Sequence, residues 1–281
     1  MIRRRSWFGR VLTYLVVIVA LSFFLFPIYW LIRTSALSLP QIYSIHVFWF
    51  PQTIKNYFAV WAVPGLPADY AHSVIIATVA TIATILMAIP VSFSLARLSS
   101  RKSAVRYLDS LLLGIALPPI VLIIPFYLIM SSLNLVDTIL GLILIEMVFN
   151  LPFSVWLTYS FFKDIPLSIE ESGIIDGCSR LGAFLRLELP LAVTGLAVAA
   201  IFVFILSWND FLFALVLTRK NAVTAPIAIL DLILGTEGGE TTPSWALASA
   251  AGIWFMLPVA VLTVFMNRYL AKALTLGGVK E

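Results

Sequence analysis

Charged residues are scarce in this chain. Its 281 residues include 18 Lys or Arg and 14 Asp or Glu, which is 11% of the sequence, whereas soluble domains carry about 25%. Apolar residues make up 61%, and a soluble protein cannot hide so much apolar surface because it needs a polar exterior. This composition excludes an ordinary soluble enzyme and a disordered chain, and it predicts an integral membrane protein.

Residues that carry catalytic or metal chemistry are also few. Cys178 is the one cysteine, so no internal disulfide is possible, and His46 and His72 are too far apart for a local metal motif. The sequence has no G-x-x-x-x-G-K-[ST] phosphate loop, no G-x-G-x-x-G and no G-x-S-x-G. We therefore expect no enzymatic activity, no catalytic residue, no metal and no cofactor bound by this chain. Any use of ATP would require another subunit.

Six apolar runs are long enough to cross a membrane as helices, which takes about 20 residues each. The runs cover residues 11–32, 73–96, 108–130, 139–161, 191–217 and 245–270. They are continuous and do not alternate, which favours helices over the strands of a membrane barrel. The sequence predicts an all-α polytopic membrane protein with six transmembrane helices.

Basic residues flank these runs unequally. If the N-terminus lies inside, the outer segments hold only Arg33, Lys55, Arg219 and Lys220 out of the 18 basic residues. Cytoplasmic segments are enriched in Lys and Arg, so both termini are predicted to be cytoplasmic. The net charge of +4 reflects this topology. Nucleic-acid binding is not expected, because a nucleic-acid-binding domain clusters its basic residues on a soluble face.

The longest inner loop, residues 162–190, differs in composition from the rest of the chain. Its charged residues are Lys163, Asp164, Glu170, Glu171, Asp176, Arg180, Arg186 and Glu188. Ser168 and Glu171 have the spacing of a capping box, and apolar residues from Ile174 to Leu185 recur at helical spacing. The pattern predicts a short amphipathic helix on the cytoplasmic side that ends before Pro190.

Two uses of this helix are open. It either lies on the lipid surface or docks into a groove of a partner protein. Helices on a lipid surface favour Lys and Arg on their polar face, whereas acidic residues are at least as common here. The balance of charge favours a protein partner.

This loop resembles the EAA loop of ABC importer permeases. Glu171-Ser172-Gly173 is followed after three residues by Gly177, and after nine more by Leu187-Glu188-Leu189-Pro190, which is the family spacing of E-A-A, G and I-x-L-P. Ser172 and Gly173 replace alanines of that pattern. Further matches follow in family order, among them Phe149-Asn150-Leu151-Pro152 and Ser207-Trp208-Asn209-Asp210. Nearly the whole chain is similar to the carbohydrate-importer permeases of the maltose (MalG) type.

The resemblance implies partners, a location and a set of coupling residues. It implies one permease domain over residues 1–281, with residues 162–190 as its cytoplasmic coupling loop, in a bacterial or archaeal cytoplasmic membrane. Such a permease pairs with a second homologous permease, two ATPase subunits that use the ATP, an extracytoplasmic solute-binding protein and membrane lipid, and it imports a sugar or polyol. The expected coupling residues are Glu171, Ser172, Gly173, Asp176, Gly177 and Pro190.

Four polar residues within or near the spans are candidates for the solute pathway. Glu146 and Asn150 lie deep in the fourth run and are four residues apart, so they share a helix face. Asn209 and Asp210 lie near the outer end of the fifth run. The alternatives are contacts with the partner permease for Glu146 and anchoring at the interface for residues 208–210.

Two other interpretations are weighed against sugar import. The same machinery would also serve glycerol phosphate or another small solute. An ion-coupled secondary transporter is a different class, which uses intramembrane carboxylates and usually has internal repeats. Glu146 is the single deep carboxylate and the two halves of the sequence show no repeat, so the importer is favoured.

Overall fold

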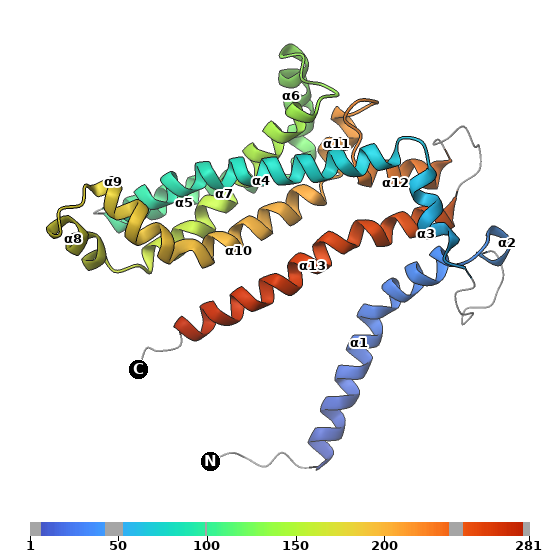
Figure 1. The fold of residues 1–281 in the computed structure, drawn as a ribbon, viewed down its shortest axis with the longest axis horizontal. Helices are drawn as coiled ribbons and strands as arrows, with labels where there is room; N and C mark the ends of the chain where they lie inside the picture. The colour runs from blue at the N-terminus through green and yellow to red at the C-terminus, as the bar shows by residue number, and fades with distance from the viewer. Residues whose placement is uncertain (1–6, 43–52, 99, 236–243, 278–281) are drawn as a thin grey trace. The chain divides into compact units, whose positions relative to one another are not determined.

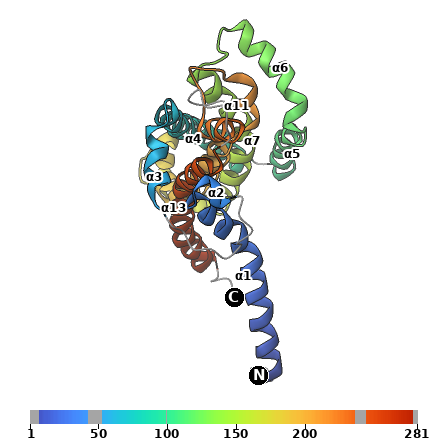
Figure 2. The same ribbon diagram turned by 90° about the vertical axis from the view of Figure 1, so that its right-hand side faces the viewer.

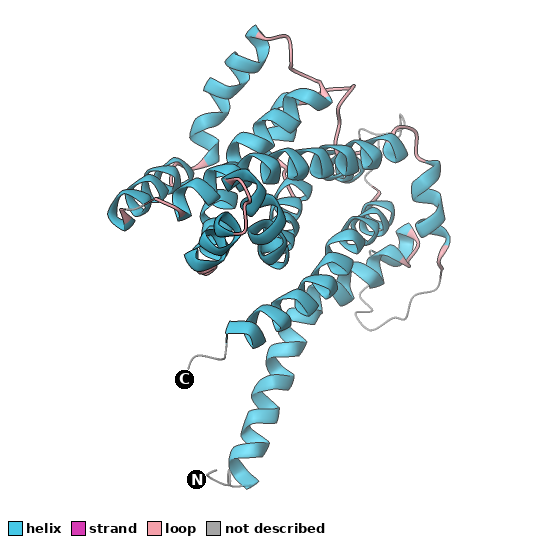
Figure 3. Cartoon of the chain, turned by 60° about the vertical axis from the view of Figure 1, so that its left-hand side comes forward, coloured by secondary structure: helices cyan, strands magenta, loops and turns pink. Residues whose placement is uncertain are grey.

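The computed structural model describes residues 7–42, 53–98, 100–235 and 244–277. Within these residues every regular element is a helix, and Figure 3 shows helices joined by short loops. The all-α prediction is confirmed. His46, which was considered as a metal ligand, lies outside the described residues.

Five helices of the described part are long and apolar enough to cross a membrane. They are Val11–Ser35, Leu66–Ala96, Ile139–Lys163, Arg180–Trp208 and Trp245–Met266. A bent pair of helices supplies a sixth candidate span. The structure therefore agrees with a polytopic membrane protein and places one long apolar helix at each of five of the six predicted runs.

The third predicted run, 108–130, is not one straight helix. It is divided between α5 (Arg101–Ile115) and α6 (Pro119–Ser132), whose segments meet at an angle of 82°. Figure 2 shows α6 leaving the axis of α5. Pro118 has an extended ψ of 130°, as expected for a residue that precedes a proline, and Pro119 has no N–H to continue the helix from α5. Hydropathy alone did not detect this break.

The fifth predicted run, 191–217, is also interrupted. α9 (Arg180–Ala183), the π-helical turn η2 (Phe184–Glu188) and α10 (Leu189–Trp208) continue into one another, and a break at residues 209–211 precedes α11 (Leu212–Leu217). Pro190 lies in the first turn of α10. Proline has no N–H to donate to the Arg186 carbonyl, and its ring would collide with that carbonyl in a regular α-helix. This explains why the turn before Pro190 is π-helical. The prediction that a helix ends before Pro190 is wrong.

The chain forms two compact units, residues 1–67 with 228–257 and residues 68–227 with 258–281. The first unit contains α1 (Trp7–Ser35), α2 (Leu39–Ile42), α3 (Lys55–Ala59), η1 (Val60–Ala62) and parts of α12 (Ala225–Leu234) and α13 (Trp245–Gly277). In this unit the Asn56 amide donates to the carbonyls of Ser35 and Leu37 at 2.8 and 3.2 Å, and the Trp254 indole donates to the Tyr57 carbonyl at 3.1 Å. These bonds hold α1, α3 and α13 together.

The second unit is a bundle of long helices that carries the candidate sites. α4 (Leu66–Ala96), α5, α7 (Ile139–Lys163) and α10 run alongside one another in Figure 1, and α8 (Leu167–Ile175) and α9 lie at one end of them. α7 contacts both α5 and α10. Gly195 of α10 lies so close to the Phe161 ring of α7 that a methyl group there would overlap it. The bundle therefore fixes the place from which the loop at 162–190 emerges.

Candidate functional site

The loop at residues 162–190 is a helix, a turn and a second helix. α8 ends at Ile175, and Gly177 in the turn that follows has a φ of +88°. The Cys178 N–H donates to the Gly173 carbonyl at 2.9 Å, and the Gly177 N–H donates to the Ile174 carbonyl at 3.0 Å. This pair of bonds is the Schellman motif, which requires a left-handed residue at the position of Gly177. A Cβ atom at this position would meet nothing within 4 Å, so the glycine is needed for its backbone conformation and not for close packing.

The predicted capping box is wrong. α8 begins at Leu167, Pro166 occupies the position before it without a side-chain hydrogen bond, and Ser168 lies inside the first turn. Within this loop, Ser179 caps a helix: its hydroxyl accepts from the Gly182 N–H at 3.1 Å at the start of α9. The single amphipathic helix predicted for this loop is therefore two helices separated by the turn at Gly177.

The six expected coupling residues divide into two groups. Glu171, Ser172, Asp176, Gly177 and Pro190 are exposed, whereas Gly173 is buried. A Cβ atom on Gly173 would lie 2.5 Å from Cδ1 of Leu187 and 3.4 Å from Cβ of Ala183. Gly173 therefore allows α8 to pack closely against the helix that follows the turn, and the exposed residues present a surface that a partner can reach.

A buried ionic cluster that the sequence did not predict lies beneath α8. Arg97, directly after α4, forms ion pairs with Glu170 of α8, at 3.3 Å from Nε to Oε2, and with Glu188 of η2. Glu188 is completely buried, and the Arg97 and Glu170 side chains are each 14% exposed. Arg97 and Glu188 are 91 residues apart, so no local spacing could have indicated the pair. We call these three residues the Arg97 cluster.

The polar residues of the fourth run form a hydrogen-bonded group. Asn150 donates through Nδ2 to Oε2 of Glu146 at 3.1 Å and to Oγ of Ser207 at 3.0 Å. Glu146 and Asn150 are buried, and their shared helix face was predicted from their spacing. Ser207 belongs to the motif at the end of the fifth run, but its spacing from Asn150 gave no sign of this contact. The group joins α7 to α10 inside one subunit.

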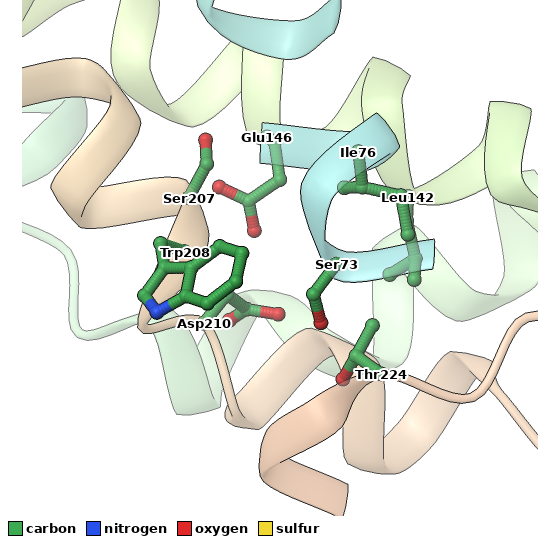
Figure 4. A pocket seen from close by; sticks show the side chains of 8 residues that line it. All are labelled: Ser73, Ile76, Leu142, Glu146, Ser207, Trp208, Asp210 and Thr224. Atoms are coloured by element: carbon green, nitrogen blue, oxygen red, sulfur yellow. The ribbon is translucent and has the colours of Figure 1, made fainter. Parts of the chain in front are cut away.

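Asp210 lies at the break between α10 and α11. Its carboxylate accepts from the Phe213 and Ala214 N–H groups at 3.3 and 3.0 Å, so it caps α11. Figure 4 shows Asp210, Glu146 and Ser207 around one small cavity, with Ser73 of α4 on its other side. Asn209 is exposed. Of the four pathway candidates, the structure therefore brings Glu146, Asn150 and Asp210 to one region of the bundle.

Asp137 connects two loops that are predicted to lie on the outer side. Its carboxylate accepts from the backbone N–H groups of residues 219–222 at distances from 2.9 to 3.3 Å, and also from the Asn221 side chain at 2.9 Å. Partial burial acts to raise its pKa, but the four backbone donors outweigh this effect, so the pKa of Asp137 lies below its ordinary value of 3.8. Sequence analysis did not identify this contact because its partners are more than 80 residues away.

We expect Asp137→Asn to lower the free energy of unfolding by about 1 kcal/mol at neutral pH, because it removes a charge that accepts several hydrogen bonds at a largely solvated site. A lowered folded-state pKa adds stability above the unfolded-state pKa, and this stability is lost as the pH falls through the folded-state value. The difference between the wild type and the variant should therefore shrink as the pH falls below about 4. Thermal unfolding of the detergent-solubilised protein measures this difference.

The exposed acid Asp164 supplies the control for this measurement. Asp164→Asn should leave the melting temperature nearly unchanged at neutral pH. Equal melting temperatures for Asp137→Asn and the wild type at neutral pH would contradict a stabilising role for the bonds to residues 219–222.

Comparison with known proteins places this geometry in a family. Residues 88–276 match the family described as the binding-protein-dependent transport system inner membrane component. The sulfoquinovosyl glycerol transport system permease protein SmoH of Agrobacterium fabrum is 32% identical over 97% of this chain and 94% of its own length. The trehalose transport system permease protein SugB of Mycobacterium tuberculosis is 31% identical over 99% of this chain and 98% of its own.

A solved structure shares the fold. A chain of a bacterial ABC transporter that imports the acidic polysaccharide alginate superposes with a TM-score of 0.79 over 95% of this chain and 98% of its own, at 21% identity. The fold is therefore that of an ABC importer permease. The family match covers more than half of the sequence and includes the loop at 162–190. This multi-pass inner membrane protein belongs to the family of permease components of binding-protein-dependent transport systems.

Proposed function

We propose that this chain is one of two permease subunits of an ABC importer that carries a sugar or polyol into the cell. The observation that carries the proposal is α8, a short helix held to the bundle on one face and exposed on the other. The names of SmoH and SugB, which refer to sulfoquinovosyl glycerol and to trehalose, support a carbohydrate as the solute. In the proposed importer, a second, homologous permease subunit lies beside this one, and the two form the pathway together.

The exposed face of α8 is the proposed contact with an ATPase subunit. Ile175 is 85% exposed and Leu181, just beyond the turn, is 66% exposed, and large apolar side chains grouped with acidic ones favour a protein groove. Glu171, Ser172 and Asp176 lie on this exposed surface. In this arrangement two ATPase subunits bind and hydrolyse the ATP, and this chain binds no cofactor.

The proposed topology has six transmembrane helices, with α5 and α6 together as the third and both termini cytoplasmic. Residues 1–281 then form one permease domain, and residues 162–190 form its coupling loop. Two sets of contacts agree with the way the six spans alternate, and the distribution of Lys and Arg sets the orientation. The Arg97 cluster joins segments that are both predicted to be inside, and Asp137 joins segments that are both predicted to be outside.

The proposed solute pathway passes the end of α10. Asn209 offers an exposed amide, and Asp210, Glu146 and Asn150 lie in the bundle beside it. Hydroxyl-rich solutes donate hydrogen bonds to carboxylates, whereas a phosphate group would be repelled by them. The residues at this end of the bundle therefore favour a neutral sugar or polyol over glycerol phosphate. An extracytoplasmic binding protein would deliver the solute here.

Purification and uptake together test the proposal. The tagged chain, purified from its native membrane, should copurify with a second permease and an ATPase. Proteoliposomes that contain this complex and the binding protein should take up one of radiolabelled trehalose, maltose or a polyol in an ATP-dependent manner, and should not take up glycerol 3-phosphate. The proposal fails if no ATPase copurifies, or if uptake follows an ion gradient without ATP.

A further inference from the structure

We propose that Arg97 is the positioning residue that makes α8 move together with the transmembrane helices. This inference rests on the proposed function, in which α8 receives the movement of the ATPase. Arg97 follows the last residue of α4, and its side chain reaches three other elements of the same unit.

One side of the Arg97 side chain contacts the coupling loop. Its Nε lies 3.3 Å from Oε2 of Glu170 on α8, and its Nη2 donates to the carboxylate of Glu188 in η2. The guanidinium group has five donors in a fixed plane, so it can bind both carboxylates at once. Glu170 and Glu188 lie on the two sides of the turn at Gly177, and Arg97 therefore connects both halves of the loop.

The other side of the Arg97 side chain contacts the bundle. Its Nη1 lies 3.5 and 3.4 Å from the carbonyls of Phe162 and Ile165, at the end of α7. Its guanidinium carbon lies 5.5 Å from the centre of the Phe93 ring on α4, a distance at which a cation is attracted to a ring. A single side chain thus contacts α4, the end of α7, α8 and the turn that leads into α10.

Glu188 makes this connection obligatory. It is completely buried, its Oε1 has no hydrogen-bond partner, and its other oxygen binds Arg97. A buried carboxylate is very costly unless a cation compensates it. When α8 is displaced, Arg97 is therefore held to Glu188, and α4 and α10 are drawn along.

The two neighbouring acids of α8 have different surroundings. Glu170 faces the Arg97 cluster and its side chain is 14% exposed, whereas Glu171 is exposed on the helix surface. Glu171 is available to a partner and Glu170 is not. In this interpretation Glu171 contacts the ATPase and Glu170 contacts Arg97, so a movement of the ATPase reaches the bundle through these two neighbouring residues.

The test compares Arg97→Gln, Arg97→Lys and Glu170→Gln in the reconstituted importer. The quantity measured is solute imported per ATP hydrolysed, with the sugar that the wild type takes up as the probe. Arg97→Gln should lower this ratio at least about tenfold and Glu170→Gln about fivefold, both within the usual range of coupling between sites. Arg97→Lys keeps the positive charge but loses the planar guanidinium group. Its ratio of solute imported to ATP hydrolysed should lie between those of the other two variants. Arg106→Gln, which changes an exposed arginine of α5, is the matched control and should leave the ratio unchanged.

A second measurement requires no solute and separates transmission from loss of folding. Amide hydrogen exchange is followed in the full complex with and without ATP and vanadate. In the wild type, nucleotide should change exchange both in α8 and at residues 205–212. In Arg97→Gln the change in α8 should persist and the change at residues 205–212 should be lost. A variant that merely unfolds would lose the ATPase subunits or exchange rapidly throughout.

The outcomes distinguish this inference from the proposed function. Unchanged import per ATP in Arg97→Gln, or a persisting nucleotide response at residues 205–212, would overturn the role of Arg97 and leave the proposed function intact. A wild-type complex whose nucleotide response never reaches residues 205–212 would also overturn it. Failure of the chain to bind any ATPase would instead overturn the proposed function.

Discussion

Replacing Gly177 by valine is expected to reduce solute import to less than about a tenth of the wild-type rate. Gly177 has a φ of +88° and completes the turn that ends α8. A β-branched residue in the left-handed region is strained, at a cost of roughly 1–2 kcal/mol. The turn would relieve this strain by opening, and α8 would lose its fixed direction relative to α9. ATP-dependent uptake, normalised to the amount of assembled complex, measures the effect.

Gly177→Ala and Gly177→Asn separate backbone conformation from side-chain size. Asparagine is larger than alanine, yet it adopts the left-handed conformation more readily. If the backbone conformation matters, the Gly177→Asn variant should import solute faster than the Gly177→Ala variant. Gly177→Asp should import solute more slowly than the wild type. If a side chain at this position instead collides with the ATPase, the order of alanine and asparagine would be reversed.

Gly114 offers a matched control for this series. A Cβ atom on Gly114 also meets nothing within 4 Å, but its φ does not lie in the left-handed region. Gly114→Val should therefore retain most of the uptake. Wild-type uptake by Gly177→Val would show that the conformation of this turn is not required for coupling.

The parts of the fold that depend on local composition could be predicted from the sequence. Long apolar runs form helices in a membrane because the backbone must satisfy its own hydrogen bonds there. The breaks inside two of these runs were missed, because hydropathy averages over a window and Pro118-Pro119 are apolar enough to pass. The start of α8 was misplaced for a similar reason. Ser168 and Glu171 have the spacing of a capping box, but Pro166 is the N-cap and the helix starts two residues earlier than that spacing requires.

The candidate site was predictable where its residues are close in sequence. Glu146 and Asn150 are four residues apart, and the expected shared face is confirmed by the bond between them. Arg97 with Glu188 and Asp137 with Asn221 are 91 and 84 residues apart. Pairs of this kind arise from the packing of whole helices and have no signature in local spacing. Charge patterning revealed that the inner loop was unusual, but it did not show which acid faces inward.

Replacing Asn150 by aspartate is expected to destabilise the bundle by about 3 kcal/mol, because breaking a buried polar pair leaves uncompensated groups inside. The Asn150 amide now donates to both Glu146 and Ser207. Aspartate offers no amide donor and would face the Glu146 carboxylate with acceptors on both sides. Thermal unfolding of the purified chain, and the yield of assembled complex, measure the loss.

The same pair of residues supplies a compensating variant. In Glu146→Gln combined with Asn150→Asp, the amide and the carboxylate exchange places, so one donor again faces one acceptor across the pair. The double variant should recover at least about 1.5 kcal/mol of the loss, a coupling that is typical of residues in direct contact. Asn209→Asp, on an exposed amide, should change stability little, although it should alter uptake if Asn209 lines the pathway. If the double variant is no more stable than Asn150→Asp alone, the hydrogen bond between α7 residues does not account for the loss, and the bond to Ser207 on α10 must carry it.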